Sequence, residues 1–264
     1  MKKPIKNSIL CAIASLTLLL CPTSNGLADL IAYEGFSYAV TNDAGSGTAL
    51  TNGYGWAEGS YWSRENSKDT LYITANSLAY GNVVTASNKF EVGGTNGRYS
   101  NRSFADTIDS SVSDVIWGGV MMKTPSIKTG RTSRFKLRNG ATSQFYVNAD
   151  SATNIVVGGG GATEIETGIS SGTSTRLYLY KIDLSGAEPV AQLWISPSNF
   201  SSEAALGAPS VTITNIGAIY TGFSVGASGG NPAPYDEIRI GTTLEDAWLT
   251  LPPVPPLATV LVVR

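Results

Sequence analysis

The sequence predicts an all-β fold in which two antiparallel sheets pack as a sandwich. Short apolar or alternating segments recur along the chain, separated by clusters of Gly, Asn, Ser, Asp and Thr, which is the pattern of strands joined by turns. Charged residues make up only 14% of the 264 residues, and no heptad pattern appears. Long solvated helices and coiled coils are therefore excluded, and the length suits one large β-domain.

A series of segments has the composition and spacing of strands in a jelly roll. Only Ser201–Leu206 and Thr242–Trp248 are expected to form helical turns, each with Ser or Thr near its start. The predicted strands are Leu30–Glu34, Tyr54–Trp62, Val83–Thr85, Lys89–Val92, Val115–Lys123, Ser133–Arg138, Ser143–Asn148, Ile155–Val157, Arg176–Asp183, Val190–Ser196, Val211–Thr214, Ala218–Val225 and Tyr235–Ile240.

One of these strands carries a basic face. Because neighbouring side chains of a strand point to opposite sides, Phe135 and Leu137 are expected in the core, with Arg134, Lys136 and Arg138 facing solvent. This face is a candidate binding site for an acidic polysaccharide. The alternative is an ordinary solvent-facing strand whose charges guard against aggregation.

Two further strands allow predictions about burial. In the last strand, Ile238 and Ile240 are expected to point inward, with Glu237 and Arg239 in solvent. Arg176–Asp183 is apolar on both faces, which favours a central strand that is covered on both sides.

The N-terminal segment has the pattern of a secretory signal. Lys2, Lys3 and Lys6 precede an apolar run, Ile9–Cys21, that is shorter than the roughly 20 residues of a transmembrane helix. Small residues precede a cut after Ala28. We therefore expect residues 1–28 to be a signal peptide and the protein to be secreted or at the cell surface. The alternative is an anchor that stays attached.

Cysteine and charge set further limits on the mature chain. Cys11 and Cys21 both lie in the signal segment, so no disulfide is expected in the domain over residues 29–250. Without the signal, the 18 basic residues fall to 15 against 20 acidic ones, a net charge of −5. We therefore expect no nucleic-acid partner, and no stable membrane span in the mature chain.

The chain contains no histidine. Nucleophile pairs that depend on an imidazole, histidine acid–base chemistry and metal sites with a histidine ligand are thereby excluded. Chemistry based on carboxylate pairs is not excluded by this observation.

The carboxylates do not form the strand pattern of a β-glucanase. A retaining glycosidase needs two carboxyl groups about 5–5.5 Å apart, which laminarinase-like enzymes place along one strand as Glu-x-Asp-x-x-Glu. Glu164 and Glu166 have no third acid in step, Asp183 has a lysine where the nucleophile is needed, and Glu245 and Asp246 are adjacent. We therefore expect no catalytic carboxylates.

Two other constellations are weaker still. Arg176, Tyr178 and Tyr180 are the one compact set that resembles a lyase site, and core aromatic packing is the favoured interpretation. Gly158–Gly161 resembles a phosphate-binding loop, but neither a lysine nor a helical pattern follows it. A loop between two strands is expected there.

Aromatic residues in a Gly- and Ser-rich stretch are candidates for glycan contact. Sugars stack their C–H faces on aromatic rings, and we expect Trp56, Tyr61 and Trp62 either to contact a ligand or to pack in the core. Trp117 and Trp194 lie in strong strands and are expected in the core.

Several segments, taken in order, resemble secreted bacterial proteins with a LamG-like, concanavalin A-like jelly roll, which often carry a PEP-CTERM sorting tail. The resemblance covers about residues 30–250 and implies a β-sandwich that binds carbohydrate. The segments that carry it are Ala32–Phe36, Gly55–Trp56, Ser77–Tyr80, Asn101–Phe104, Val115–Lys123, Tyr180–Asp183, Leu193–Pro197 and Tyr235–Thr243.

The resemblance extends to the C-terminus and to calcium. Residues 251–264 combine a Pro-rich start, a short apolar run and a final Arg264, similar to a degenerate sorting tail, although Pro-Glu-Pro is missing. The alternative is a Pro-rich extension. LamG-like domains often bind calcium, for which Asp150 and Asp236 are the candidate ligands, with turn formation by Asp236 as the alternative.

The sequence thus predicts an exported, non-catalytic jelly roll that binds a glycan or an extracellular matrix. A polysaccharide-acting enzyme on the same fold and a structural surface or biofilm component without a small ligand remain the alternatives. The binding interpretation itself rests on fold-level analogy.

Overall fold

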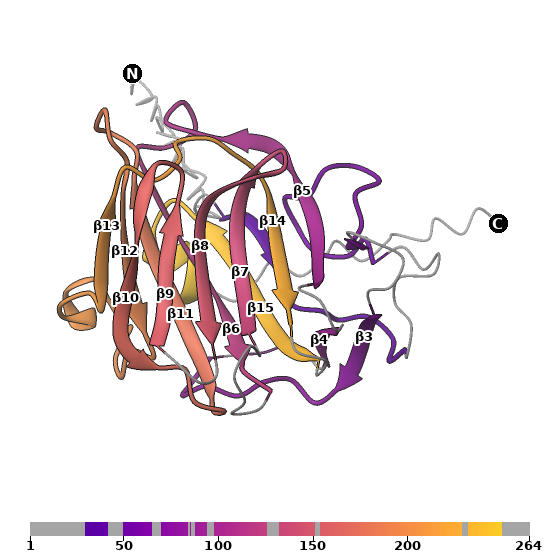
Figure 1. The fold of residues 1–264 in the computed structure, drawn as a ribbon. Coiled ribbons are helices and arrows are strands. Elements are labelled where there is room, and N and C mark those ends of the chain that lie inside the picture. Colours follow the sequence, from indigo (N-terminus) through magenta and orange to yellow (C-terminus); the bar gives the residue numbers. More distant parts are fainter. Residues whose placement is uncertain are drawn as a thin grey trace, which may run out of the picture.

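The computed structural model is a jelly-roll sandwich of two antiparallel sheets, which confirms the predicted fold class (Figure 1). The structure describes residues 30–41, 50–64, 70–83, 85, 88–93, 98–125, 132–150, 154–228 and 232–249. The signal segment 1–28 and the tail 251–264 lie outside these ranges and stay predictions. Within them, no helix has the length and apolar character needed to cross a membrane.

The first sheet has eight strands in the order β13-β12-β11-β6-β15-β4-β3, with β1 also paired to β15. The strand pairs of this sheet are antiparallel. Its strands are β1 (Leu30–Glu34), β3 (Thr70–Ala75), β4 (Asn88–Gly93), β6 (Val115–Lys123), β11 (Thr175–Asp183), β12 (Val190–Ile195), β13 (Val211–Thr214) and β15 (Ala233–Gly241).

The second sheet has seven strands in the order β10-β9-β8-β7-β14-β5-β2, and β7 to β10 lie toward the viewer in Figure 1. Two short helical turns, η1 (Ala204–Leu206) and η2 (Glu245–Leu249), complete the described elements. The strands are β2 (Ser63–Arg64), β5 (Arg98–Ile108), β7 (Thr132–Asn139), β8 (Thr142–Asp150), β9 (Asn154–Gly159), β10 (Ala162–Ser170) and β14 (Tyr220–Ala227).

Most predicted strands are confirmed to within a few residues, but two are wrong. Tyr54–Trp62 is a loop in which Tyr54 and Trp56 form isolated bridges, and the described ends of Val83–Thr85 lie outside any strand. The sequence analysis missed β2, β3, β5 and β10. Gly158–Gly161 forms the tight turn of the β9–β10 hairpin, as expected for a connection between strands.

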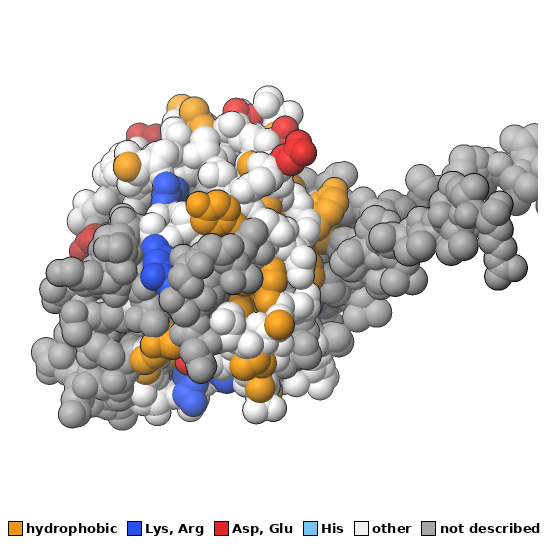
Figure 2. Space-filling model, turned by 90° about the vertical axis from the view of Figure 1, so that its right-hand side faces the viewer, with side chains coloured by type: hydrophobic (Ala, Val, Ile, Leu, Met, Phe, Trp, Pro, Cys, Tyr) orange, Lys and Arg blue, Asp and Glu red, His pale blue; other side chains and the backbone are white. Residues whose placement is uncertain are grey.

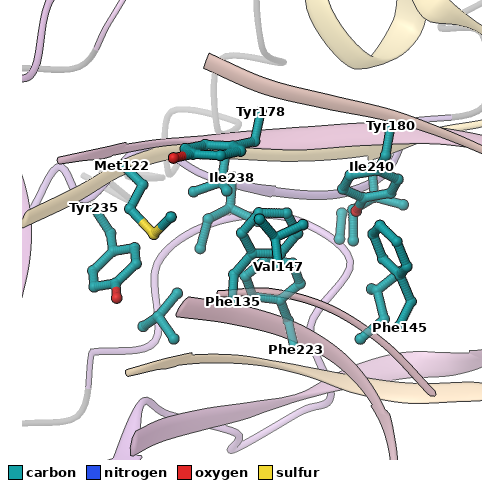
Figure 3. Close-up of a cluster of buried hydrophobic side chains, with 14 of the residues drawn as sticks. Met122, Phe135, Phe145, Val147, Tyr178, Tyr180, Phe223, Tyr235, Ile238 and Ile240 are labelled. Carbon is teal, nitrogen blue, oxygen red and sulfur yellow. The ribbon is translucent and has the colours of Figure 1, made fainter. Parts of the chain in front are cut away.

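Aromatic rings from both sheets fill the core between them (Figure 3). Phe135 of β7 and Phe223 of β14 stack with centroids 5.8 Å apart, and Phe135 also stacks on Tyr180 of β11 at 6.0 Å. These rings are buried, as is Leu137, so the predicted inward face of β7 is confirmed. Buried aromatic area of this kind is the main source of sandwich stability.

Strand β11 is covered on both faces, as its sequence predicts. Tyr178 and Tyr180 point into the core between the sheets, whereas Leu177 and Leu179 belong to a second apolar cluster on the outer side of the eight-stranded sheet. We call that outer side the covered face. Its cluster consists of Leu78, Trp117, Met121, Leu177, Leu179, Trp194, Leu206, Leu244, Ala247 and Trp248.

The prediction that Glu237 and Arg239 face solvent is wrong, because η2 and β1 cover this part of β15. Both side chains are buried and form an ion pair of 2.9 Å between Arg239 Nη2 and Glu237 Oε2. The Arg239 guanidinium lies 5.5 Å from the ring centroid of Tyr33 and 5.4 Å from that of Trp248. Glu237 has a φ of 49°, next to a register shift in the β15–β6 pairing.

Candidate binding pocket

The outer side of the seven-stranded sheet is polar, and we call it the open face. Antiparallel register places outward side chains of β5, β14, β7 and β8 in rows across the sheet. These residues are Tyr99, Asn101, Ser103, Gly222, Ser224, Gly226, Arg134, Lys136, Arg138, Tyr146 and Asn148.

A pocket of about 720 Å³ opens at one end of this face. The loop between β1 and β2 forms one wall, and the middle of β5 with the adjoining ends of β7 and β14 forms the floor and the opposite wall. The polar and aromatic lining residues are Glu58, Ser60, Tyr61, Ser63, Asn101, Arg102, Ser103, Phe104, Arg138 and Thr221.

The pocket brings together two sets of residues that the sequence analysis predicted separately. Tyr61 comes from the predicted aromatic set and has 53% of its surface exposed. Arg138 comes from the predicted basic strand, where its guanidinium Nε donates to the carbonyl oxygen of Gly140 at 2.9 Å. A fixed guanidinium opposite an exposed ring can orient a polar ligand that has an apolar face.

Trp56 anchors the pocket loop and does not present its ring to solvent. Its ring stacks on Phe104 at 5.4 Å, and its Nε1 donates to the carbonyl oxygen of Tyr33 at 2.9 Å. Backbone hydrogen bonds from Ala57 to Ser103 (3.1 Å) and from Ala105 to Gly55 (2.9 Å) tie the loop to β5. Trp56 is 8% exposed, so its role here is to position the loop that carries Tyr61.

The prediction that Trp62 contacts a ligand is also wrong, because its side chain is buried beneath the pocket loop. Its exposed fraction is 1%, and its ring packs 5.3 Å from Phe90. Its Nε1 donates to Glu34 Oε2 at 3.1 Å, and Arg102 pairs with the same carboxylate. A ring enclosed in this way cannot stack on a ligand, and instead it holds the loop against the core.

The floor of the pocket is flat because β14 carries only small residues on its outward side. Gly222 faces the pocket, and a Cβ atom there would lie 2.7 Å from the carbonyl oxygen of Arg102. Ser224 and Gly226 continue the row, and the Ser224 hydroxyl contacts Asn101. Close packing of β14 against β5 therefore requires a glycine at position 222. Without a side chain there, backbone and small polar groups form the floor of the pocket.

Arg134 and Lys136 lie beyond the pocket on the same strand as Arg138. Both contact the ring of Tyr99, which belongs to β5. Lys136 Nζ lies 3.9 Å from the centroid of this ring, and the Arg134 guanidinium lies 5.4 Å from it. Arg134 also donates to the Tyr99 hydroxyl. The three predicted basic residues therefore share the open face, as expected from the alternation of β7.

Several pocket residues were missed by the sequence analysis: Glu58, Ser60, Asn101, Ser103 and Gly222. The first two lie in the segment interpreted as a strand, and the next two lie in β5, which was not predicted. A signal for the floor was present in β14, where small and large residues alternate in Tyr220–Ala227.

The two predicted calcium ligands do not form a calcium site. Asp150 ends β8 in one sheet and Asp236 lies in β15 of the other. The Asp236 carboxylate is buried and accepts hydrogen bonds from the backbone amides of Leu78 (2.8 Å) and Glu237 (2.9 Å). Backbone N–H donors occupy the oxygens that a cation needs, so these residues do not fit calcium and Asp236 organises its turn instead.

Burial, and then the neighbouring Glu237 carboxylate, raise the pKa of Asp236 to about 8. A carboxyl group that keeps its proton at neutral pH is a poor cation ligand. Among the described residues, no group of three or more Asp, Glu, Cys or His side chains is suitable for a metal ion.

The residues weighed for catalysis lie away from the pocket. Glu164 accepts a hydrogen bond from the Tyr146 hydroxyl, and partial burial together with this carboxylate raises the pKa of Tyr146. Tyr178 and Tyr180 are buried in the core. Arg176 donates from Nε to the carbonyl oxygen of Ser171 at 2.7 Å, which is a structural contact.

No protein-family model and no curated protein matches the chain. The resemblance to LamG-like proteins with a PEP-CTERM tail therefore stays a prediction from the quoted segments.

Solved structures with a similar fold include carbohydrate-binding proteins and an enzyme. The metal-free carbohydrate recognition domain of Emp46p is 7% identical, over 67% of this chain and 89% of that chain, with a TM-score of 0.40. Lectin II from Ulex europaeus is 8% identical, over 68% of this chain and 94% of that chain, with a TM-score of 0.37.

A sialidase from Trypanosoma rangeli is 8% identical over 82% of this chain but only 35% of that chain, with a TM-score of 0.41. At such scores these likenesses carry no argument about function. The assignment to two-sheet sandwiches rests on the strand pairing itself.

Proposed function

We propose that this protein is a non-catalytic glycan-binding β-sandwich whose ligand occupies the pocket beside Tyr61. The observation that carries the proposal is the pairing of one exposed aromatic ring with hydroxyl, amide and guanidinium groups around a cavity of about 720 Å³. Cavities of about 300–1,000 Å³ are the usual size for small-ligand sites.

The lining suits a saccharide better than an apolar ligand. Ser60, Ser103, Asn101 and Arg138 offer hydrogen-bond donors and acceptors of the kind that sugar hydroxyls need, while Tyr61 offers a surface for C–H groups. On the side of the molecule where β3 and β5 lie, hydrophobic side chains form separate patches among polar atoms (Figure 2). In the pocket, hydroxyl, amide and guanidinium groups surround one exposed ring, so the proposed recognition depends on these polar groups.

The arrangement of the carboxylates supports binding without catalysis. Among the residues that line the pocket, Glu58 is the one acid, and a retaining glycosidase needs a partner carboxyl about 5–5.5 Å away. The enzyme alternative therefore has no specific observation in its favour.

We further propose that the protein is exported and acts outside the cytoplasm. The support is the sequence pattern of residues 1–28, with its lysines, apolar run and small residues before the cut. Detection of the protein in culture supernatant, cleaved after Ala28 by mass spectrometry, tests this; an uncleaved protein found only in the cytoplasm contradicts it.

Two exposed tyrosines allow a matched test of the pocket. Tyr61 and Tyr54 are 53% and 52% exposed, and only Tyr61 lines the pocket. A glycan array first identifies a ligand, and calorimetry then measures its affinity. We expect Tyr61→Ala to weaken binding about tenfold, or ~1.4 kcal/mol, and Tyr54→Ala to leave affinity unchanged.

The same experiment separates the alternatives. If no glycan binds and both variants melt like the wild type, the proposal fails and a structural surface role gains support. Release of reducing sugar from a bound glycan would instead establish the enzyme alternative.

A further inference from the structure

The structure assigns a charge to this ligand: we infer that the protein binds an anionic glycan, carrying carboxylate or sulfate groups, that extends from the pocket along β7 toward Arg134. This inference rests on the proposed function, because Arg138 in the pocket is the first of the three cations that carry it.

The three cations are evenly spaced along one strand. Arg138, Lys136 and Arg134 alternate with the core residues Leu137 and Phe135, so they share the open face. Alternate residues of a strand lie roughly 6.7 Å apart, so the row spans roughly 13 Å from the pocket outward. Repeated anionic groups on a polymer match such a row, whereas a neutral sugar makes no use of it.

Strand β14, beside this row, has almost no outward side chains. Register pairs Gly222 with Arg138, Ser224 with Lys136 and Gly226 with Arg134. These three β14 residues are buried, so a ligand that extends from the pocket meets the side chains of the cations and not the strand between them and β5. On the side of β5, Asn101 contacts the Ser224 hydroxyl.

Tyr99 lies at the far end of this row of cations. Its ring reaches from β5 across the Gly226 position to Lys136 and Arg134, with the contact distances given above. Cations held over a ring lose less side-chain freedom when a ligand binds, which favours affinity. The Tyr99 contact also places two positive charges together at this end of the row.

Acidic residues of the same sheet flank the row but do not interrupt it. Asp150 ends β8 next to β7, Asp106 belongs to β5, and Glu164 of β10 accepts a hydrogen bond from Tyr146 of β8. Glu58 lies on the opposite wall of the pocket, in the β1–β2 loop. The outward positions of β7 from Arg134 to Arg138 therefore carry three positive charges in succession, although the chain as a whole carries a net charge of −2.

Binding assays with defined polymers test the inference. The full chain is titrated with polygalacturonate, dextran sulfate, uncharged dextran and single-stranded DNA at low and high salt. We expect binding to a charged glycan, weakened about tenfold by the double variant Arg134→Gln, Lys136→Gln and by higher salt. The two charged glycans distinguish carboxylate from sulfate as the recognised group.

Lys181→Gln is the matched control, because it removes one positive charge from the eight-stranded sheet, where Lys181 pairs with Glu203. It should change affinity less than about twofold. Lys136→Gln alone, checked for an unchanged melting temperature, keeps the test valid if the double variant folds poorly.

Three outcomes overturn the inference. Tyr61-dependent binding of uncharged dextran without an effect of the β7 variants leaves the proposed function standing and refutes the anionic ligand. Equal affinity for DNA and for charged glycans shows unspecific charge attraction. Absence of binding to every polymer refutes the inference and the proposed function together.

Discussion

The two outer faces of this sandwich differ in burial: one is covered by further apolar residues and the other is exposed to solvent. On the covered face, β6, β11 and β12 present Trp117, Leu179 and Trp194, over which η1, η2 and neighbouring loops pack. On the open face, β5 and β7 present tyrosine, asparagine, serine and basic residues that stay partly exposed, and β14 between them presents only small residues. Both faces follow from two-residue alternation, so composition of the outward positions alone decides whether a face is buried.

The comparison shows how one fold separates stability from recognition. The covered face gives the eight-stranded sheet a second apolar layer, including the Trp117–Trp194 stack at 5.6 Å. The open face contributes little apolar burial beyond the core, so its residues can be exchanged for binding with small effects on folding. Substitutions on the two faces should accordingly differ in what they damage.

The largest contrast is expected for aromatic truncation. Trp117 is 3% exposed, so Trp117→Ala should lower the free energy of unfolding by about 3–5 kcal/mol. Tyr99→Ala on the open face should cost about 1 kcal/mol or less. Urea unfolding measures both, and equal losses would break the distinction between the faces.

Added methyl groups should sharpen the contrast at smaller magnitude. At Gly119 on β6, a Cβ atom would lie 2.1 Å from the Tyr178 carbonyl oxygen and 3.1 Å from Trp248 Cζ2. Gly119→Ala should therefore cost about 1–3 kcal/mol through overpacking.

Gly158→Ala on β9 is the counterpart. There the nearest atom is the Tyr146 hydroxyl oxygen at 2.5 Å, the end of a partly exposed side chain that can rotate away. We expect a loss of about 1 kcal/mol or less, chiefly from the hydrogen bond to Glu164. A larger loss than for Gly119→Ala would contradict the assignment of faces.

The last expected contrast is a pH dependence that originates in the eight-stranded sheet. The folded-state pKa of Asp236 is raised to about 8 from its usual 3.8. Its contribution to stability is complete below about pH 4 and is lost as the pH rises toward 8. Asp236→Asn should flatten the decline in urea midpoint between these pH values.

Asp183→Asn is the control for this pH series. Hydrogen bonds from the Ser185 hydroxyl and backbone amide lower the pKa of Asp183, so its titration acts at more acidic pH. The decline between pH 4 and 8 should persist in that variant. If Asp236→Asn leaves the decline unchanged, Asp236 is not its source.

The strands that could be predicted have apolar side chains on at least one face, although β3 was missed despite its buried Leu71 and Ile73. Val115–Lys123 and Val211–Thr214 were predicted with their observed bounds because branched and aromatic residues dominate them. Strand β5 was missed, since its inward position at Arg102 is charged and pairs with Glu34, a residue far away in the sequence. A charge that is satisfied by a distant partner is invisible to local periodicity.

The candidate site was predictable in its parts and not in its assembly. Tyr61 and Arg138 were both named from local composition, but only the packing of the β1–β2 loop on β5 and β14 brings them to one cavity. Trp56 and Trp62 were indistinguishable from Tyr61 by sequence, because hydrogen bonds to Tyr33 and Glu34 decide their burial.

The pairing of β1 with β15 has a kinetic consequence. The first and the last described strands are neighbours, with Glu34 opposite Ile238. Pairing between strands so far apart in the sequence is slow, and it requires that β15 has been synthesised. Ribosome-bound intermediates that end before β15 are therefore expected to lack the β1–β15 pairing. A chain truncated before Ala233 would leave β1, β4 and β6 without the partner they share, and should fail to fold as a unit.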